Sequence, residues 1–459
     1  MTSEIRIGVL GNVDSGKSTI IGVLNKGILD DGRGKARSCI LMHPHEKKSG
    51  RTSSITSIYC NNLNYKNNIL FIDLAGHEQY LKTTIHGIMG YNIDYIMIVI
   101  GSNMGLTKMS IEHLKLIIHL KFKFFIVLTK IDLCPENVLH NTIKDIKIFL
   151  NENNINNNIP ILSVSSKTGK NIDQLKRLLF NIKNYNKLTN FEKSILFTIE
   201  SKYNVNGVGI VLSGKTLNGN IKKNDKLLLG PINNNFINIM IKSLHDNFRN
   251  EINELNIGQS GCVNIKNIDK KIIDLKKIKL RKGLYIIKND SLNNCDLLTW
   301  SFQAKINIIS NHSTTISSNY QPVINCNKIS QTARIISIIN VNDNNNNNNF
   351  KDNNNNNLKD NNNDDFKDNN NDDFKDNNND DFYLENINND SVNIDFNKFN
   401  LKKNKNNNIN DNNLIVRTGD VSTVIFKFCY RPEIINKNDI FIFREGATKG
   451  IGLVINLIN

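Results

Sequence analysis

The sequence lacks three features that would point to a membrane or a secreted protein. It has no run of about 18 apolar residues, so we expect no membrane-spanning helix. The N-terminus runs straight into a strand-like segment without a basic region or a cleavage site, so we expect no secretory signal. The seven cysteines are scattered singly and form no CxxC pair, which favours a reducing compartment. We therefore expect a cytoplasmic protein.

The charge of the chain has two readings. A formal net charge of +15 and a pI of about 9.3 favour phosphate-rich partners, nucleic acid above all. The chain is also rich in Asn, Lys and Ile together, which is typical of a compositional bias in which solvated lysines bind nothing specific. The charge alone is therefore weak evidence for a nucleic-acid partner.

The first part of the 459-residue chain alternates apolar strand-like runs with amphipathic helical patterns. This alternation predicts βαβ units and a mainly parallel sheet over residues 1–188. The expected strands are 5–10, 69–74, 95–101, 124–130 and 159–166, and the clearest helical patterns are 110–121 and 171–183.

The rest of the chain predicts two antiparallel β-barrel domains, over residues 189–295 and 296–459, because short strand-like runs alternate with Gly and Asn turns. The second is interrupted at about 342–413 by an Asn/Asp-rich insert containing the repeat "FKDNNNDD". One apolar residue in eight cannot build a core, so we expect a disordered loop there. The basic stretch 269–283 fits an RNA-facing segment or an ordinary barrel strand with a solvated face.

The strongest motif is "GNVDSGKS", which follows a predicted strand and precedes a helix. Its glycines let backbone N–H groups surround a phosphate, its lysine neutralises phosphate charge, and its serine can ligate Mg²⁺. A simple Gly-rich turn is the weaker interpretation in this context. The predicted phosphate-binding residues are Gly11, Asn12, Val13, Asp14, Ser15, Gly16, Lys17, Ser18 and the adjoining Thr19.

A second motif, "FIDLAGHEQY", places Asp73 at the end of a predicted buried strand. A carboxylate there can hold Mg²⁺ through water, and the N–H of Gly76 can sense a γ-phosphate. His77 can orient the attacking water, which makes it the predicted catalytic residue. Asp-x-x-Gly turns are common, but one strand away from a phosphate loop the motif is strong.

A third motif lies in "FFIVLTKIDL", which departs by one residue from the guanine-reading pattern Asn-Lys-x-Asp. Lys130 can pack along a purine, and Asp132 can accept two hydrogen bonds from guanine, which adenine cannot donate. The hydroxyl of Thr129 can donate to a ring nitrogen or tie the loop down. Downstream, the backbone of Ser165, Ser166 and Lys167 can meet the guanine carbonyl. Together the motifs predict a GTP site.

The segment 32–57 between the first two motifs is polar and dotted with glycine, which suits a segment that orders around γ-phosphate and Mg²⁺. Thr52 is the predicted third Mg²⁺ ligand beside Ser18 and Asp73, with Ser53 and Ser54 as rivals. A structural zinc site built from Cys39, His43 and His45 is the less favoured alternative, because no fourth soft ligand accompanies them.

These motifs resemble those of translational GTPases of the elongation factor Tu type. "LDDGRGKAR", "HEKKSGRTSSI", "DLAGHEQYLKTT" and "LTKIDLCP" are similar to the GTP-binding protein 1 and 2 subfamily, which also has Leu-Ala before Gly-His and Thr-Lys-x-Asp at the guanine loop. Later stretches resemble that subfamily's second and third domains, so the likeness covers nearly the whole chain outside the insert. It implies the site roles given above to Lys17, Ser18, Thr52, Asp73, His77, Thr129, Lys130 and Asp132.

The resemblance implies a GTPase that acts as a ribosome-linked and tRNA-linked switch, with GTP/GDP and Mg²⁺ as cofactors. The runner-up is a GTP-dependent RNA-binding regulatory protein, for example in mRNA turnover, with slow hydrolysis. A metabolic enzyme on the same scaffold, such as a GTPase subunit that forms a nucleotide sulfate, is disfavoured by the subfamily-specific stretches. The expected partners are the ribosome and tRNA or another RNA, without DNA or membrane, and the expected state is a monomer.

Overall fold

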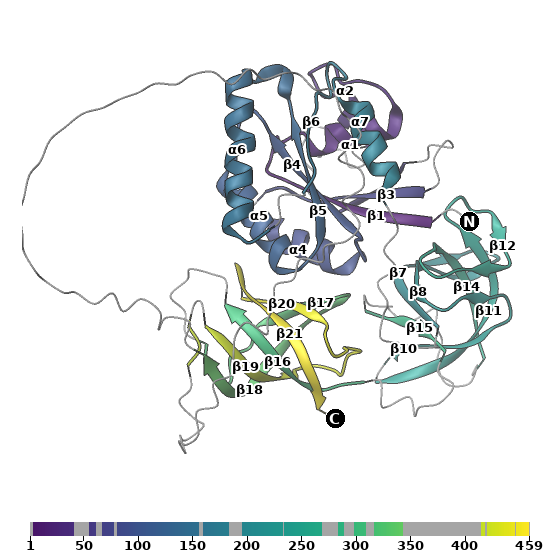
Figure 1. The fold of residues 1–459 in the computed structure, drawn as a ribbon. Coiled ribbons are helices and arrows are strands. Elements are labelled where there is room, and N and C mark those ends of the chain that lie inside the picture. The colour runs from purple at the N-terminus through teal and green to yellow at the C-terminus, as the bar shows by residue number, and fades with distance from the viewer. Residues whose placement is uncertain are drawn as a thin grey trace, which may run out of the picture.

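The computed structural model contains an α/β domain and two antiparallel β-barrels (Figure 1). The insert predicted at 342–413 lies outside the described residues, except for Asn342. The basic stretch 269–283 also lies outside them, except for Gly283. The structure describes residues 3–40, 55–60, 67–77, 80–155, 159–182, 195–232, 234–268, 283–288, 298–308, 316–342, 415–417, 420–445 and 447–458.

The α/β domain is built on a six-stranded sheet with the order β2-β3-β1-β4-β5-β6. All neighbouring strands are parallel except β2 and β3, which are antiparallel. β2 was not among the expected strands, because at the sheet edge it buries only alternate residues of a polar sequence. The strands are β1 (Ser3–Leu10), β2 (Thr56–Cys60), β3 (Asn67–Asp73), β4 (Tyr95–Gly101), β5 (Lys123–Thr129) and β6 (Ile161–Ser163).

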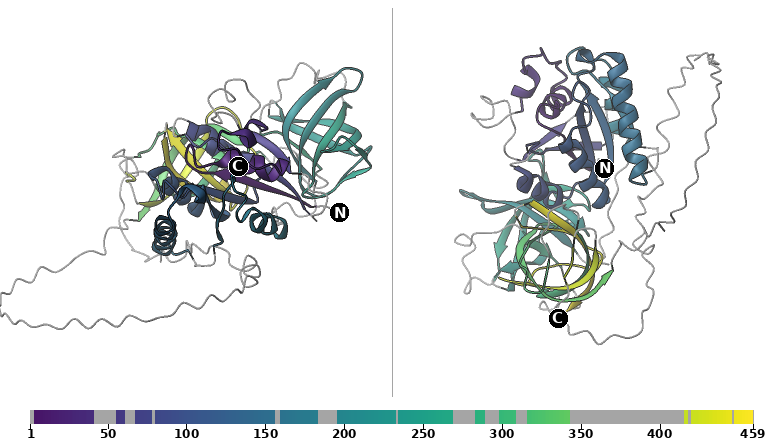
Figure 2. Two further views of the ribbon diagram at one scale, coloured as in Figure 1. Left: turned by 90° about the horizontal axis from the view of Figure 1, so that it is seen from above. Right: turned by 90° about the vertical axis from the view of Figure 1, so that its left-hand side faces the viewer.

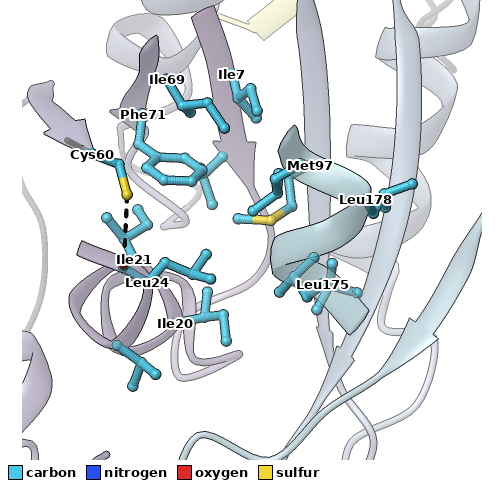
Figure 3. Packing of buried hydrophobic residues seen from close by; sticks show 14 of the residues in the cluster. Ile7, Ile20, Ile21, Leu24, Cys60, Ile69, Phe71, Met97, Leu175 and Leu178 are labelled. Atoms are coloured by element: carbon cyan, nitrogen blue, oxygen red, sulfur yellow. Dashed lines mark hydrogen bonds between the residues drawn. The ribbon is translucent and has the colours of Figure 1, made fainter. Parts of the chain in front are cut away.

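Helices cover both faces of this sheet. Side chains alternate along each strand, so Ile7 and Met97 pack on one face against α1 and α7, while Ile96 and Ile98 pack on the other against α4, α5 and α6. Figure 3 shows the first of these cores. The helices are α1 (Lys17–Lys26), α2 (Lys35–Ser38), α4 (Leu81–Gly90), α5 (Lys108–His119), the 3₁₀ turn η2 (Ile131–Leu133), α6 (Glu136–Glu152) and α7 (Ile172–Asn181).

The first barrel closes through six strands in the order β10-β15-β7-β8-β14-β11, because β10 also pairs with β11. β12 extends this sheet, and β9 and β13 form a separate pair. The strands are β7 (Leu196–Val205), β8 (Gly209–Asn218), β9 (Ile221–Lys222), β10 (Lys226–Ile232), β11 (Asn235–Asp246), β12 (Glu251–Ile252), β13 (Glu254–Leu255), β14 (Ser260–Asn267) and β15 (Tyr285–Ile287).

The second barrel is a closed ring of six strands, β16-β19-β18-β17-β20-β21, seen end-on in the right-hand view of Figure 2. Five phenylalanines fill it; the rings of Phe302 and Phe428, for example, are 5.3 Å apart. The strands are β16 (Ser301–Ile308), β17 (Val323–Cys326), β18 (Ile329–Asn342), β19 (Val421–Phe428), β20 (Ile440–Glu445) and β21 (Ala447–Ile458). The predicted fold class is confirmed, whereas the residue limits given to the three domains stay predictions.

A buried polar group of five residues, here named the Arg6 cluster, joins the α/β domain to both barrels. The Arg6 guanidinium lies 2.9 Å from a carboxylate oxygen of Glu4 and 2.5 Å from one of Glu200 on β7. It also donates to the hydroxyl of Ser260 on β14 at 2.6 Å. From the second barrel, the Lys328 ammonium lies 3.6 Å from Glu200. Charges from three parts of the chain therefore meet at one junction.

In the described part of the chain, every helix is too short or too polar to cross a membrane.

Candidate nucleotide-binding site

The loop between β1 and α1 has the close turns that a phosphate-binding loop requires. A Cβ on Gly11 would lie 2.1 Å from the carbonyl oxygen of Val99, so only glycine fits against β4 at that point. Gly16 begins α1 with a positive φ of 88°, a conformation that glycine adopts without strain. The predicted loop therefore packs at the carboxyl ends of the central strands, with the N-terminus of α1 directed at it.

Lys17 is held across this loop. Its ammonium group donates to the carbonyl oxygens of Gly11 and Asn12, at 3.0 and 2.8 Å. Burial lowers the pKa of Lys17, although the charges of Asp73 and Asp14 oppose this shift. The cation is thus partly desolvated, and an anion placed beside it would restore the lost stabilisation of its charge.

Asp73 and Ser18 lie side by side where β3 meets the loop. Asp73 is 1% exposed, and the Ser18 hydroxyl donates to its carboxylate at 2.8 Å. A hydroxyl and a carboxylate are hard oxygen ligands of the kind that Mg²⁺ prefers. The residues present therefore fit the predicted Mg²⁺ site.

The segment after β3 closes over the phosphate loop. The hydroxyl of Thr84 on α4 donates to the carbonyl of Ala75 at 2.7 Å and holds this segment in place. A Cβ on Gly76 would lie 2.4 Å from both the Gly11 carbonyl oxygen and the Lys17 ammonium nitrogen, so glycine is needed there. His77 follows, and its ring packs edge-on against Tyr80 at a centroid distance of 6.0 Å.

These segments surround an open pocket. Eight of its ten lining residues belong to the predicted phosphate-binding and catalytic set: Val13, Asp14, Gly16, Lys17, Ser18, Thr19, Gly76 and His77. Arg37 and Tyr80 complete the lining, and neither was predicted as a site residue. The quoted stretches "LDDGRGKAR" and "FIDLAGHEQY" contain both residues, but the spacing alone did not show that their side chains reach the pocket.

The predicted guanine loop is tied to the phosphate loop by Thr129. The hydroxyl of this residue donates to the Ser15 carbonyl at 2.5 Å, and the residue is almost fully buried. The Thr129 carbonyl in turn accepts from the backbone N–H and the hydroxyl of Ser102. Of the two roles predicted for the Thr129 hydroxyl, the geometry favours the one that fixes the loop.

Asp132 and Ser165 form the other side of the guanine loop. The Ser165 hydroxyl donates to one Asp132 carboxylate oxygen at 2.6 Å and accepts from the N–H groups of Lys167 and Thr168. This network orients the carboxylate while leaving Asp132 exposed. Lys130 adopts a positive φ of 60°, which turns the chain between Thr129 and Asp132.

Three further predicted residues occupy supporting positions. Asn12 donates from its side-chain amide to the Thr107 hydroxyl at the start of α5, 3.3 Å away. Ser15 is buried, and the carbonyl of Ser166 accepts from the N–H of Asp30 at 2.9 Å. The guanine loop is therefore bonded to the segment that leads into α2.

Thr52 and its rivals Ser53 and Ser54 lie outside the described residues, as do His43 and His45 of the alternative zinc site. Cys39, the remaining member of that zinc set, is exposed. Within the ranges that the structure describes, no group of three or more His, Cys, Asp or Glu side chains is placed to hold a metal ion.

A comparison with known protein families shows which kind of P-loop domain this part of the chain resembles. The family model described as "Elongation factor Tu GTP binding domain" matches residues 2–185. Over these residues the chain is similar to an elongation factor Tu-type GTP-binding domain. This match confirms the resemblance to elongation factor Tu-type GTPases predicted from the motifs.

The similarity to known proteins extends beyond this domain. GTP-binding protein 1 of Xenopus laevis is 32% identical over 99% of this chain, and GTP-binding protein 2 of Homo sapiens is 28% identical over the same share. The chain spans 64% and 69% of the lengths of these relatives. Most of the chain is thus similar to members of the predicted GTP-binding protein 1 and 2 subfamily.

Solved structures show the same fold. A bacterial selenocysteine-specific elongation factor EF-Sec matches 99% of this chain and 58% of its own, with a TM-score of 0.64 and 21% identity. Translation elongation factor SelB from Methanococcus maripaludis, in complex with the GTP analogue GppNHp, matches 100% of this chain and 80% of its own. Its TM-score is 0.63 and its identity 17%, so this likeness concerns the fold.

Proposed function

We propose that this protein binds GTP with Mg²⁺, hydrolyses it to GDP and phosphate, and acts as a ribosome-linked and tRNA-linked switch. The observation that carries the proposal is the pocket in which Lys17, Ser18 and His77 meet, although they come from two separate motifs. Thr129 bonds the guanine loop to the same phosphate loop, so both ends of a GTP molecule have a prepared binding surface.

Guanine recognition falls to Asp132. A carboxylate oriented by Ser165 can accept the two hydrogen bonds that guanine N1–H and the 2-amino group donate. Lys130 packs its stem along the purine ring, and the backbone of Ser165, Ser166 and Lys167 meets the guanine carbonyl. Adenine lacks the two donors and would leave the Asp132 carboxylate unsatisfied.

Phosphate binding falls to Gly11–Thr19, with Lys17 as the counter-charge to the β- and γ-phosphates. Ser18 and Asp73 would hold Mg²⁺, which when bound neutralises charge on the same phosphates. Thr52 is the proposed third residue at the ion.

His77 is the proposed catalytic residue. It lines the pocket directly after Gly76, whose N–H would sense the γ-phosphate. From there its ring can hold the attacking water in line with the γ-phosphorus, which is the positioning that phosphoryl transfer requires.

The link to translation rests on the relatives. The selenocysteine-specific elongation factor of Haemophilus influenzae is 27% identical over 64% of this chain, and the structural neighbours named above are elongation factors. We propose that this protein likewise works with the ribosome and tRNA, as a monomer in the cytosol.

The test compares GTP hydrolysis by the purified protein with and without ribosomes. We expect ribosomes to stimulate hydrolysis and His77→Ala to lower the stimulated rate by about 100-fold or more, since removing a positioned group of this kind costs 10²–10⁴ in rate. GTP affinity should be retained. His140→Ala, an exposed histidine on α6, is the matched control and should hydrolyse GTP like the wild type.

Unchanged turnover in His77→Ala would reject the role of His77. A filter assay without GTP-dependent retention of ribosomes or tRNA would reject the translational role. If RNA were still bound, that result would favour the GTP-dependent RNA-binding regulatory protein with slow hydrolysis.

A further inference from the structure

Arg37 is a cation in the phosphate pocket that belongs to none of the GTP-binding motifs. It lies on the short helix α2, and its side chain lines the pocket together with Lys17, Ser18 and His77. Within the described residues 32–40, the two other basic side chains, Arg33 and Lys35, are exposed and do not line the pocket. Arg37 is therefore singled out from its basic neighbours by position.

The position of α2 is fixed by contacts on two sides. The Asp30 carboxylate accepts from the N–H groups of Gly32 and Ala36, at 3.0 and 2.9 Å, and so caps the start of the helix. On the inner side Ala36 is buried against α1, where a Cβ on Gly22 would come within 2.3 Å of its carbonyl oxygen. Only glycine at position 22 lets α2 lie this close to α1, and the contact sets Arg37 beside the phosphate loop.

The side chain of Arg37 is also directed by its surroundings. It passes so close to Gly34 that a Cβ there would lie 2.3 Å from the guanidinium Nε. Among the described residues Arg37 is in no ion pair, in contrast to Arg6 and Arg431. A half-buried, permanently charged guanidinium thus faces a phosphate pocket without a carboxylate partner from the described chain.

We propose that Arg37 is a further catalytic residue, which donates hydrogen bonds to the terminal phosphates of GTP and stabilises the charge of the transition state. The proposal rests on the GTP hydrolysis proposed above. In that reaction water forms a bond to the γ-phosphorus, the bond from this atom to the β–γ bridging oxygen breaks, and GDP, phosphate and a proton result. Arg37 keeps its proton throughout and acts only through its charge and its planar fork of donors.

The charge balance of the pocket supports this role. Lys17 and a divalent ion together do not cancel the charge of a triphosphate, and the surplus moves toward the bridging and γ-oxygens as the bond breaks. Arginine supplied from the same chain or from a partner meets this need in other GTPases, where it is worth about 10³–10⁵ in rate. Arg37 is placed to supply it from the same chain.

The test measures single-turnover GTP hydrolysis, with and without ribosomes, and the affinity for GDP, in Arg37→Ala, Arg37→Lys and Arg33→Ala. We expect Arg37→Ala to hydrolyse GTP at least about 100-fold more slowly than the wild type. Its GDP affinity should fall by less than about tenfold, because the interaction strengthens only in the transition state. Arg37→Lys should stay at least about tenfold below the wild-type rate, since an ammonium group lacks the fork of donors. Arg33→Ala should match the wild type.

Hydrolysis by Arg37→Ala within about twofold of the wild type would overturn the proposal, as would a GDP affinity that falls as far as the rate. If Arg37→Lys hydrolysed GTP at the wild-type rate, the forked hydrogen-bond contact of Arg37 with the phosphates would be rejected. If the wild-type protein bound GTP without hydrolysing it, the proposed function would fail as well. Wild-type hydrolysis that Arg37→Ala leaves unchanged would reject the role of Arg37 alone.

Discussion

Two buried cations in the α/β domain, Lys17 and Arg6, are held in opposite ways. Lys17 is 7% exposed and donates to backbone carbonyl oxygens, whereas Arg6 is 1% exposed and lies in contact with the carboxylates of Glu4 and Glu200. Burial opposes the charge of both. At Lys17 burial prevails and the pKa is lowered, while at Arg6 the two carboxylates prevail and the pKa is raised.

The difference separates a binding site from a structural junction. A buried charge that is paired with opposite charges of the protein holds the folded segments in one arrangement. Removing one member of the group leaves the other charges buried and unpaired. A buried charge that is only partly compensated is stabilised further when an anionic ligand arrives. The Arg6 cluster is of the first kind and the phosphate pocket of the second.

Arg6→Ala tests the first half of this comparison and has the largest expected effect. The change leaves Glu4 and Glu200 buried without their main counter-charge, and breaking a buried pair costs about 3–5 kcal/mol. We expect the free energy of local opening, measured by hydrogen exchange of the amides of β1 and β7, to fall by this amount.

Lys222→Ala is the matched control, because Lys222 forms a solvent-exposed ion pair with Glu254 at 3.8 Å. Exposed pairs contribute at most about 1 kcal/mol, so exchange in β1 and β7 should not change. Equal protection in Arg6→Ala and the wild type would show that the Arg6 cluster does not hold the junction together.

Lys17→Met tests the second half and should weaken nucleotide binding without weakening the fold. Loss of a buried charge contact to the phosphates should cost about 2–5 kcal/mol of GTP affinity, measured by titration calorimetry. The unfolding midpoint without nucleotide should stay the same or rise. The pKa of folded Lys17 lies below its unfolded value, so the protonated side chain costs stability at neutral pH. A lower midpoint would show that Lys17 is structurally compensated, like Arg6.

The motif residues could be proposed from the sequence because each motif is local and sits at a strand end. Gly11, Asp73 and Thr129 follow or end three parallel strands of one sheet, β1, β3 and β5, so their position at the same edge follows from the fold class. The Arg6 cluster could not be predicted from the sequence, because Arg6 and Glu200 are 194 positions apart and come together only when the first barrel packs against the α/β domain. Arg37 depends on the close contact of Gly22 with Ala36, which no spacing rule reveals.

Substitution of Thr129 has the smallest expected effect. It tests how the guanine loop is coupled to the phosphate loop, because the Thr129 hydroxyl joins the two. Its hydroxyl has a single proton, which the hydrogen bond to the Ser15 carbonyl uses. Thr129→Val keeps the side-chain shape and removes this bond, so GTP affinity should fall by about 1 kcal/mol, or roughly fivefold. Thr129→Ser, which keeps the hydroxyl, is the control.

The measurement that separates the two roles of Thr129 uses 7-deaza-GTP, which lacks the ring nitrogen N7. If the hydroxyl only fixes the loop, the ratio of the affinities for GTP and 7-deaza-GTP should be the same in Thr129→Val and in the wild type. A ratio that falls to one only in the variant would mean that the Thr129 hydroxyl donates to N7. In that case the bond to Ser15 would have to break when nucleotide binds, and the two loops would be coupled by the ligand instead of by the protein.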